Sequence, residues 1–188
     1  MQALPQTRRV ITRRVTIVSV IAMVVIALSA TSAFAHVTIA PDSAPRGGFQ
    51  ILSFSVPNEK DNASTVQVQV QLPQDQVIPF VSVQPKPGWT VSVTKRQLTK
   101  PVKQEGETIT EAVDTVTWSG GTIGPGQFDL FTISAGPLPT KVKQLTFKAL
   151  QTYSDGEVVR WIEPTPKGGP EPEHPAPVLT LTKGKAAH

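Results

Sequence analysis

The residues best suited to chemistry stand at Ala33-Phe34-Ala35-His36, where two alanines flank an aromatic residue and a histidine follows. This Ala-x-Ala spacing is typical of a signal-peptide cleavage site. If the chain is cut after Ala35, His36 becomes residue one and offers a metal ion both its imidazole and its free α-amine. Two nitrogens completed by oxygens suit Cu(II), which also heads the affinity order of the divalent first-row metals. Cleavage itself would therefore create a chelating site.

The composition favours the oxidised form of copper at such a site. Cu(I) prefers sulfur ligands, and removing residues 1–35 takes away Met1 and Met23, the only methionines of a chain without cysteine. We expect binding as Cu(II) that loosens on reduction, and that weakens in acid because the nitrogen donors must be deprotonated. The alternative is that His36 is incidental, since cleavage depends on the small residues before the cut.

Residues 1–35 have the pattern of an export signal. Two Arg-Arg pairs, at 8–9 and 13–14, precede an apolar run from Val15 to Ala30, which is short for a membrane span. We predict a cleaved signal, with an uncleaved anchor as the alternative, and a mature protein that is periplasmic, envelope-associated or extracellular. The arginine pairs suggest twin-arginine export, although positive charge is ordinary ahead of any such apolar run.

Cleavage also changes the charge balance. The precursor has 18 Lys+Arg and 14 Asp+Glu; four of the basic residues and none of the acidic ones leave with the signal, so 18 minus 4 gives 14 of each sign. A mature formal charge of zero removes the electrostatic support for a nucleic-acid partner. Because no disulfide is available, about 150 mature residues must be stabilised by one apolar core.

The elements that must position His36 are expected to be β-strands, because Val, Thr, Ile and Phe alternate with polar residues in short runs. The predicted strands are Val37–Ile39, Phe49–Val56, Thr65–Leu72, Ile78–Val83, Trp89–Leu98, Ile109–Trp118, Gln127–Ala135, Leu145–Tyr153, Val158–Ile162 and Val178–Leu181. This pattern favours an all-β chain with one two-sheet β-sandwich, immunoglobulin- or cupredoxin-like, over residues 36–182 and a disordered tail over 183–188.

Three local patterns give sharper expectations. In the clearest alternation, Val66, Val68, Val70 and Leu72 share one face, which we expect to be buried. The pair Asp155-Gly156 between apolar runs predicts a hairpin. Residues 163–177 contain six prolines and cannot form a central strand, so they should run extended over the surface.

The histidine count argues against hydrolytic enzymes. Besides His36, the chain has only His174, in the proline-rich segment, and His188, at the end. There is no Gly-x-Ser-x-Gly or His-Glu-x-x-His motif, and a Ser-His-Asp triad would depend on the poorly oriented His174. We predict a non-enzyme. Two alternatives are an oxidative copper enzyme on polysaccharide, with His174 as second histidine, and an adhesion or polymer-binding module without a metal.

An ordered set of motifs resembles the YcnI-like family of copper-binding bacterial envelope proteins. The motifs are His36-Val37-Thr38-Ile39-Ala40-Pro41, Val56-Pro57-Asn58-Glu59-Lys60-Asp61-Asn62, Pro87-Gly88-Trp89, Gly126-Gln127-Phe128 and Tyr153-Ser154-Asp155-Gly156-Glu157-Val158-Val159-Arg160-Trp161. The resemblance implies a β-sandwich with a mononuclear Cu(II) site called a monohistidine brace. It also implies a carrier or chaperone in copper acquisition or homeostasis, beside a membrane copper transporter or other copper-handling envelope proteins.

The resemblance assigns three site residues. The N-terminal histidine is His36, the carboxylate is Glu59 in Val-Pro-Asn-Glu-Lys, and the tryptophan near the metal is Trp161 in Val-Val-Arg-Trp-Ile-Glu. Glu163 is the second choice for the carboxylate, and His174 is a rival ligand. The alternatives are that Glu59 is a solvated turn residue and that Trp161 packs in the core.

Two further expectations accompany this assignment. Trp89, after a Pro-Gly turn, and Trp118, at the end of a strand, are expected to be structural. Many relatives continue into a C-terminal membrane helix, whereas this sequence ends soon after the predicted sandwich, so we expect a released or periplasmic protein.

Overall fold

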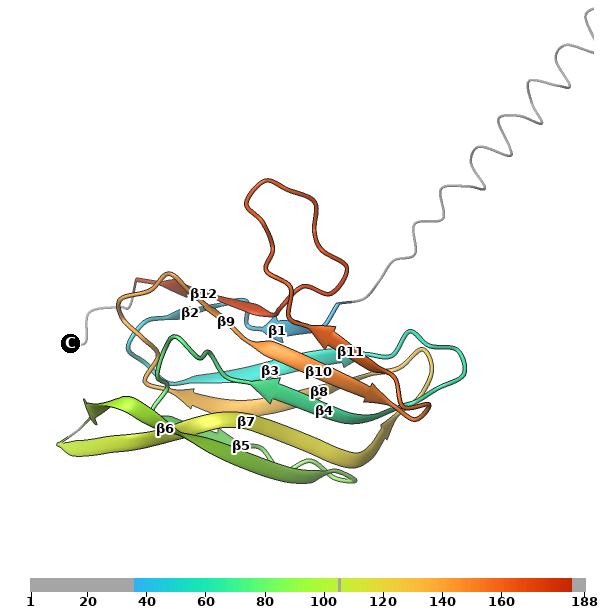
Figure 1. Ribbon diagram of the computed structural model, residues 1–188, viewed down its shortest axis with the longest axis horizontal. Helices are drawn as coiled ribbons and strands as arrows, with labels where there is room; N and C mark the ends of the chain where they lie inside the picture. The colour runs from blue at the N-terminus through green and yellow to red at the C-terminus, as the bar shows by residue number, and fades with distance from the viewer. Residues whose placement is uncertain (1–35, 105, 184–188) are drawn as a thin grey trace, which may run out of the picture. The chain divides into compact units, whose positions relative to one another are not determined.

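The computed structural model describes residues 36–104 and 106–183, which form twelve β-strands and no helix (Figure 1). The predicted export signal and residues 184–188 of the predicted tail lie outside the described residues. Within the described ranges, no helix is long and apolar enough to cross a membrane. The all-β prediction is confirmed.

The strands in chain order are β1 (Thr38–Ala40), β2 (Ser43–Pro45), β3 (Gln50–Pro57), β4 (Thr65–Gln71), β5 (Phe80–Val83), β6 (Thr90–Gln104), β7 (Glu107–Ile123), β8 (Phe128–Gly136), β9 (Gln144–Thr146), β10 (Lys148–Tyr153), β11 (Val158–Trp161) and β12 (Val178–Thr182). The two principal sheets have the orders β1-β3-β8-β5 and β11-β10-β4-β7-β6. A third, three-stranded sheet has the order β2-β12-β9. The parallel pair of β2 and β12 belongs to this third sheet.

The third sheet arises because one predicted strand serves two sheets. The sequence predicts a single strand over Leu145–Tyr153, but the chain divides at Phe147, whose backbone N–H donates to the carbonyl of Pro177 at 2.9 Å. Before this point β9 pairs with β12, and after it β10 pairs with β4. Phe147 is fully buried at the division.

The alternation in β4 is confirmed for Val68 and Val70, which are fully buried, but not for Val66. The pairing of β4 with β7 shifts between Thr65 and Gln67. Such a bulge inserts one extra residue into a strand and reverses its in–out order from there on. Thr65 is therefore fully buried, whereas Val66 is only partly buried.

Aromatic side chains join the two principal sheets. Phe131 of β8 lies with its ring centroid 5.2 Å from that of Trp118 in β7, and Trp89 meets Phe131 edge-on at 5.0 Å. Phe131 and Trp118 are fully buried. Trp89 and Trp118 thus have the structural role that the sequence predicts, although β7 continues past Trp118 to Ile123.

The predicted hairpin at Asp155-Gly156 connects β10 and β11. Gly156 has a φ of +89°, in the left-handed region that glycine adopts without strain. Its N–H donates to the carbonyl of Tyr153 at 3.0 Å. The register that follows places Trp161 opposite Ala149, so this turn fixes how far along the sheet the tryptophan lies.

Gly121 allows the Trp89 indole to lie directly against β7. A Cβ at this position would come within 2.1–2.4 Å of the indole ring. We expect Gly121→Ala to displace the indole and to lower the free energy of unfolding by about 1–3 kcal/mol, the usual cost of overpacking. Denaturant unfolding followed by tryptophan fluorescence measures this. Gly48→Ala is the control, because nothing lies within 4 Å of its Cβ position; equal unfolding midpoints would contradict the prediction.

Candidate metal centre

His36 stands just ahead of β1, an edge strand of the four-stranded sheet. β1 pairs with β3 so that Thr38 lies opposite Ser55, and counting back along this register brings His36 level with Pro57. Val37, only 2% exposed, fixes the start of the strand to the core. The His36 side chain is 22% exposed, so it is held in place and still accessible to an ion.

Trp161 ends β11, an edge strand of the five-stranded sheet, and it contacts His36 and His174. Its ring centroid lies 5.9 Å from that of His36 and 5.1 Å from that of His174, which meets it edge-on. The indole is 4% exposed and belongs to the core. On sequence grounds, core packing of Trp161 and proximity of Trp161 to His36 are alternatives. In the structure, both are true of this residue.

A buried amide links the two principal sheets beneath the site. The Trp161 indole N–H donates to Oε1 of Gln151 at 3.1 Å, and Nε2 of Gln151 donates to the carbonyl of Pro57 at 2.7 Å and to the hydroxyl of Thr65 at 2.8 Å. Gln151 is 1% exposed. Sequence reasoning missed it, although a polar residue at an inward position of an alternating strand was a visible signal.

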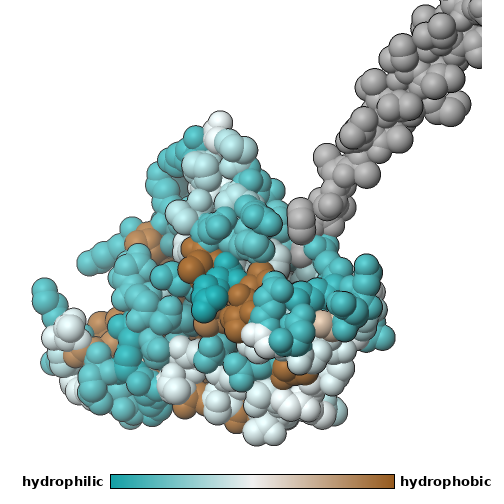
Figure 2. All heavy atoms as spheres, turned by 45° about the vertical axis from the view of Figure 1, so that its right-hand side comes forward, coloured by the Kyte–Doolittle hydropathy of each residue, from teal (hydrophilic) through white to brown (hydrophobic). Residues whose placement is uncertain are grey.

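A carboxylate lies beside His36. Oε1 of Glu171 is 3.3 Å from Nδ1 of His36, and the Glu171 side chain is 63% exposed. Glu171 belongs to the proline-rich segment 163–177, which leaves β11, projects from the sheets and returns to β12 (Figure 1). The face of this projection in view is hydrophilic or neutral (Figure 2). The sequence alone gives no reason to place Glu171 beside His36.

Glu59, the carboxylate implied by the family resemblance, is exposed in the loop that follows β3. Burial raises the pKa of the Tyr153 phenol. The positive charge of Lys60 lowers this pKa, whereas the negative charges of Glu157 and Glu59 raise it further. Glu59 therefore lies near the turn end of β10. The adjacent Lys60 bonds Asp155 at 2.6 Å and Glu157 at 2.7 Å. This contact lowers the pKa of Asp155 and fastens the loop to the hairpin turn.

Glu163, the second choice for the carboxylate, closes the base of the proline-rich segment. Its carboxylate accepts a hydrogen bond from the His174 backbone N–H at 3.2 Å, and its own N–H donates to the His174 carbonyl at 3.1 Å. Beyond β11 the segment forms an isolated bridge between Glu163 and Pro175. As predicted, the segment forms no central strand, but it projects as a loop with a turn over 167–169 instead of running extended over the surface, and residues 175–177 are buried (Figure 1).

The donors around His36 fit copper once the chain is cut. In the described part of the chain, no group of three or more His, Cys, Asp or Glu side chains could hold a metal ion. The imidazole of His36 and the carboxylate of Glu171 supply two donors, and the α-amine of His36 would be a third. Two nitrogens and one oxygen form a donor set that suits Cu(II).

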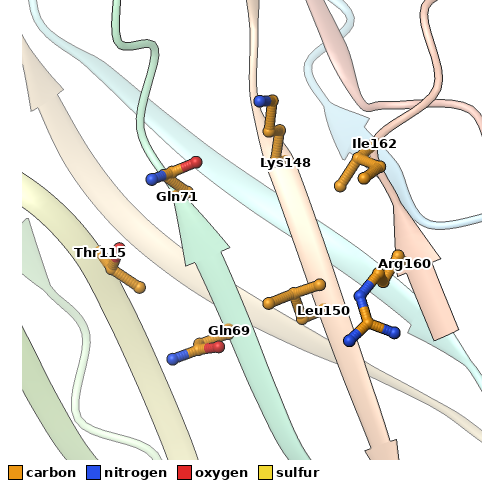
Figure 3. Close-up of a pocket in the computed structure, with 7 residues that line it drawn as sticks. All are labelled: Gln69, Gln71, Thr115, Lys148, Leu150, Arg160 and Ile162. Atoms are coloured by element: carbon orange, nitrogen blue, oxygen red, sulfur yellow. The ribbon is translucent and has the colours of Figure 1, made fainter. Parts of the chain in front are cut away.

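A separate pocket of about 330 Å³ opens on the outer face of the five-stranded sheet (Figure 3). It is lined by Gln69, Gln71, Thr115, Lys148, Leu150, Arg160 and Ile162. Arg160 and Ile162 adjoin Trp161 in sequence, but alternation turns them to the opposite face. The lining contains two cations and no carboxylate, imidazole or thiolate, so this pocket does not have the chemistry of a metal site.

Comparisons with known proteins identify relatives of this chain in sequence and in fold. A family model described as a domain of unknown function, DUF1775, matches residues 36–181. The copper-binding protein CutI of Bacillus subtilis (strain 168) is 32% identical over 155 residues, 81% of this chain, and the chain spans 65% of the length of that relative. A crystal structure from Nocardia farcinica, of an uncharacterized protein with an immunoglobulin-like fold, is 39% identical with a TM-score of 0.64. That match covers 79% of this chain and 99% of the Nocardia chain, and it confirms the immunoglobulin-like prediction.

Proposed function

This chain belongs to the DUF1775 family, the YcnI family that its motifs resemble, and on that premise we propose that it is an exported, non-catalytic Cu(II) carrier. The observation that carries the proposal is the environment of His36, whose ring contacts Trp161 and whose Nδ1 faces a carboxylate. The family match begins at this same residue. CutI, which bears the name of a copper-binding protein, supports copper as the ion.

Each residue near His36 has a distinct task in this proposal. Cleavage after Ala35 converts the backbone nitrogen of His36 from an amide into an amine, so one residue chelates the ion through two nitrogens. A carboxylate offsets part of the positive charge of the ion. The Trp161 indole has no ligand lone pair, and its N–H already donates to Gln151. Trp161 therefore positions the imidazole and shields one side of it from water.

The family brace, made by His36 and Glu59 with Trp161 beside the metal, is the form of the site that the resemblance predicts. We propose a carrier rather than an oxidative enzyme because a brace in such an enzyme takes two histidines. The ring of His174 is instead packed edge-on against the indole of Trp161. Copper-handling envelope proteins or a membrane copper transporter are the proposed partners, outside the cytoplasm.

A single added residue tests this proposal. One form of the chain begins at His36, and the other carries one alanine in front of it, which acylates the amine and leaves every side chain in place. Every core residue that the structure describes lies within residues 36–183, so both forms should fold. We expect the first form to bind one Cu(II) with a tetragonal electron paramagnetic resonance spectrum, and the extended form to bind about 100-fold more weakly, some 2.8 kcal/mol.

Thermal unfolding of both forms provides the control for this comparison. The two unfolding midpoints should agree, because the extension alters only the chain end. Equal Cu(II) affinities for the two forms would show that the amine is not a ligand, and the proposal would then be wrong.

A further inference from the structure

The proline-rich segment 163–177, called the strap below, is anchored at its base. The backbone of Glu163 and that of His174 are joined by a hydrogen bond, and the Glu163 carboxylate accepts a second one from the His174 N–H. The imidazole of His174 lies edge-on against the indole of Trp161. The base of the strap is thus fixed to the same indole that His36 contacts.

This anchoring directs one strap carboxylate toward His36. Glu171 stands three residues before His174 and is flanked by Pro170 and Pro172, which restrict its backbone. Its Oε1 lies 3.3 Å from Nδ1 of His36. Metal–nitrogen and metal–oxygen bonds of about 2.0–2.2 Å, the values for zinc, place neighbouring donors roughly 3 Å apart. The observed spacing, which is that of an imidazole–carboxylate ion pair, is thus also compatible with two donors to one ion.

We infer that Glu171 is a carboxylate ligand of the site and that the strap is the element that places this carboxylate beside His36. This inference rests on the proposed Cu(II) binding. The imidazole and amine of His36 come from the edge of one sheet, and the carboxylate comes from a segment anchored at the edge of the other. The side chain of Glu171 is exposed, so a partner can reach this ligand without disturbing the buried indole.

The inference is tested with three variants of the chain that begins at His36, using Cu(II) competition titration and electron paramagnetic resonance. Glu171→Gln should weaken Cu(II) binding at least about tenfold and should change the electron paramagnetic resonance spectrum. Even the loss of a residue that only hydrogen-bonds a metal ligand typically weakens metal binding by about tenfold or more. Glu173→Gln is the matched control, because it lies exposed in the same strap and changes the charge equally. It should bind within about twofold of the parent chain, and neither variant should alter thermal unfolding.

Glu59→Gln distinguishes the strap from the carboxylate that the family resemblance implies. If Glu171→Gln binds as tightly as the parent, with the same spectrum, the inference is wrong while the copper proposal stands. A loss confined to Glu59→Gln also overturns it and assigns the carboxylate to the loop after β3. A parent chain that shows no one-to-one site refutes both the proposed function and this inference.

Discussion

Replacing Phe131 with alanine is expected to lower the free energy of unfolding by about 3–5 kcal/mol. Phe131 is fully buried, and its ring connects β8 to Trp118 and Trp89 on the opposite side of the core. The substitution removes apolar contacts and leaves a cavity that paired strands can close only in part. Since a domain of this kind is stable by about 5–15 kcal/mol, the loss is a large share of the total.

Denaturant unfolding of Phe131→Ala beside Phe128→Ala measures this effect. Phe128 lies in the same strand, but its side chain is 65% exposed on the opposite face. The exposed substitution should change the free energy of unfolding by no more than about 0.5 kcal/mol. Similar losses for both variants would show that the Phe131 contacts do not hold the sheets together.

The strands could be predicted because a half-buried strand alternates between apolar and polar residues, whatever its partners are. The bulge at Thr65 could not, because it depends on how β4 pairs with β7. The third sheet could not be predicted either. Phe147 leaves the strand ladder to bond Pro177, and nothing in the local sequence identifies an acceptor thirty residues away.

The site shows the same division between local and long-range information. His36 could be singled out locally, because the cleavage pattern precedes it. Its proximity to Trp161 came from the family resemblance, since no spacing rule relates residues on the edges of two different sheets. Glu171 lies in a proline-rich segment without periodicity, so only the fold shows which carboxylate returns to His36. Gln151 could have been suspected from its inward position.

Gln151→Leu is expected to lower the free energy of unfolding by about 2–4 kcal/mol and to weaken Cu(II) binding about tenfold. The substitution keeps a side chain of similar size but removes the hydrogen-bond partner of the Trp161 indole and of the Pro57 carbonyl. Each buried polar group left without a partner costs about 1–3 kcal/mol. His36 contacts the indole and lies level with Pro57, so its orientation should loosen as well.

Thr65→Val is the control that distinguishes an effect of Gln151 on copper binding from its effect on the stability of the core. It removes one hydrogen bond to the Gln151 amide and leaves the bonds to Trp161 and Pro57 in place, so it should cost about 1 kcal/mol with unchanged copper affinity. Both variants are titrated with Cu(II) well below their unfolding midpoints, so that each is folded. If Gln151→Leu then binds copper as tightly as Thr65→Val does, Gln151 stabilises only the core. A selective loss of affinity instead identifies Gln151 as the residue through which the buried interior positions the partly buried imidazole of His36.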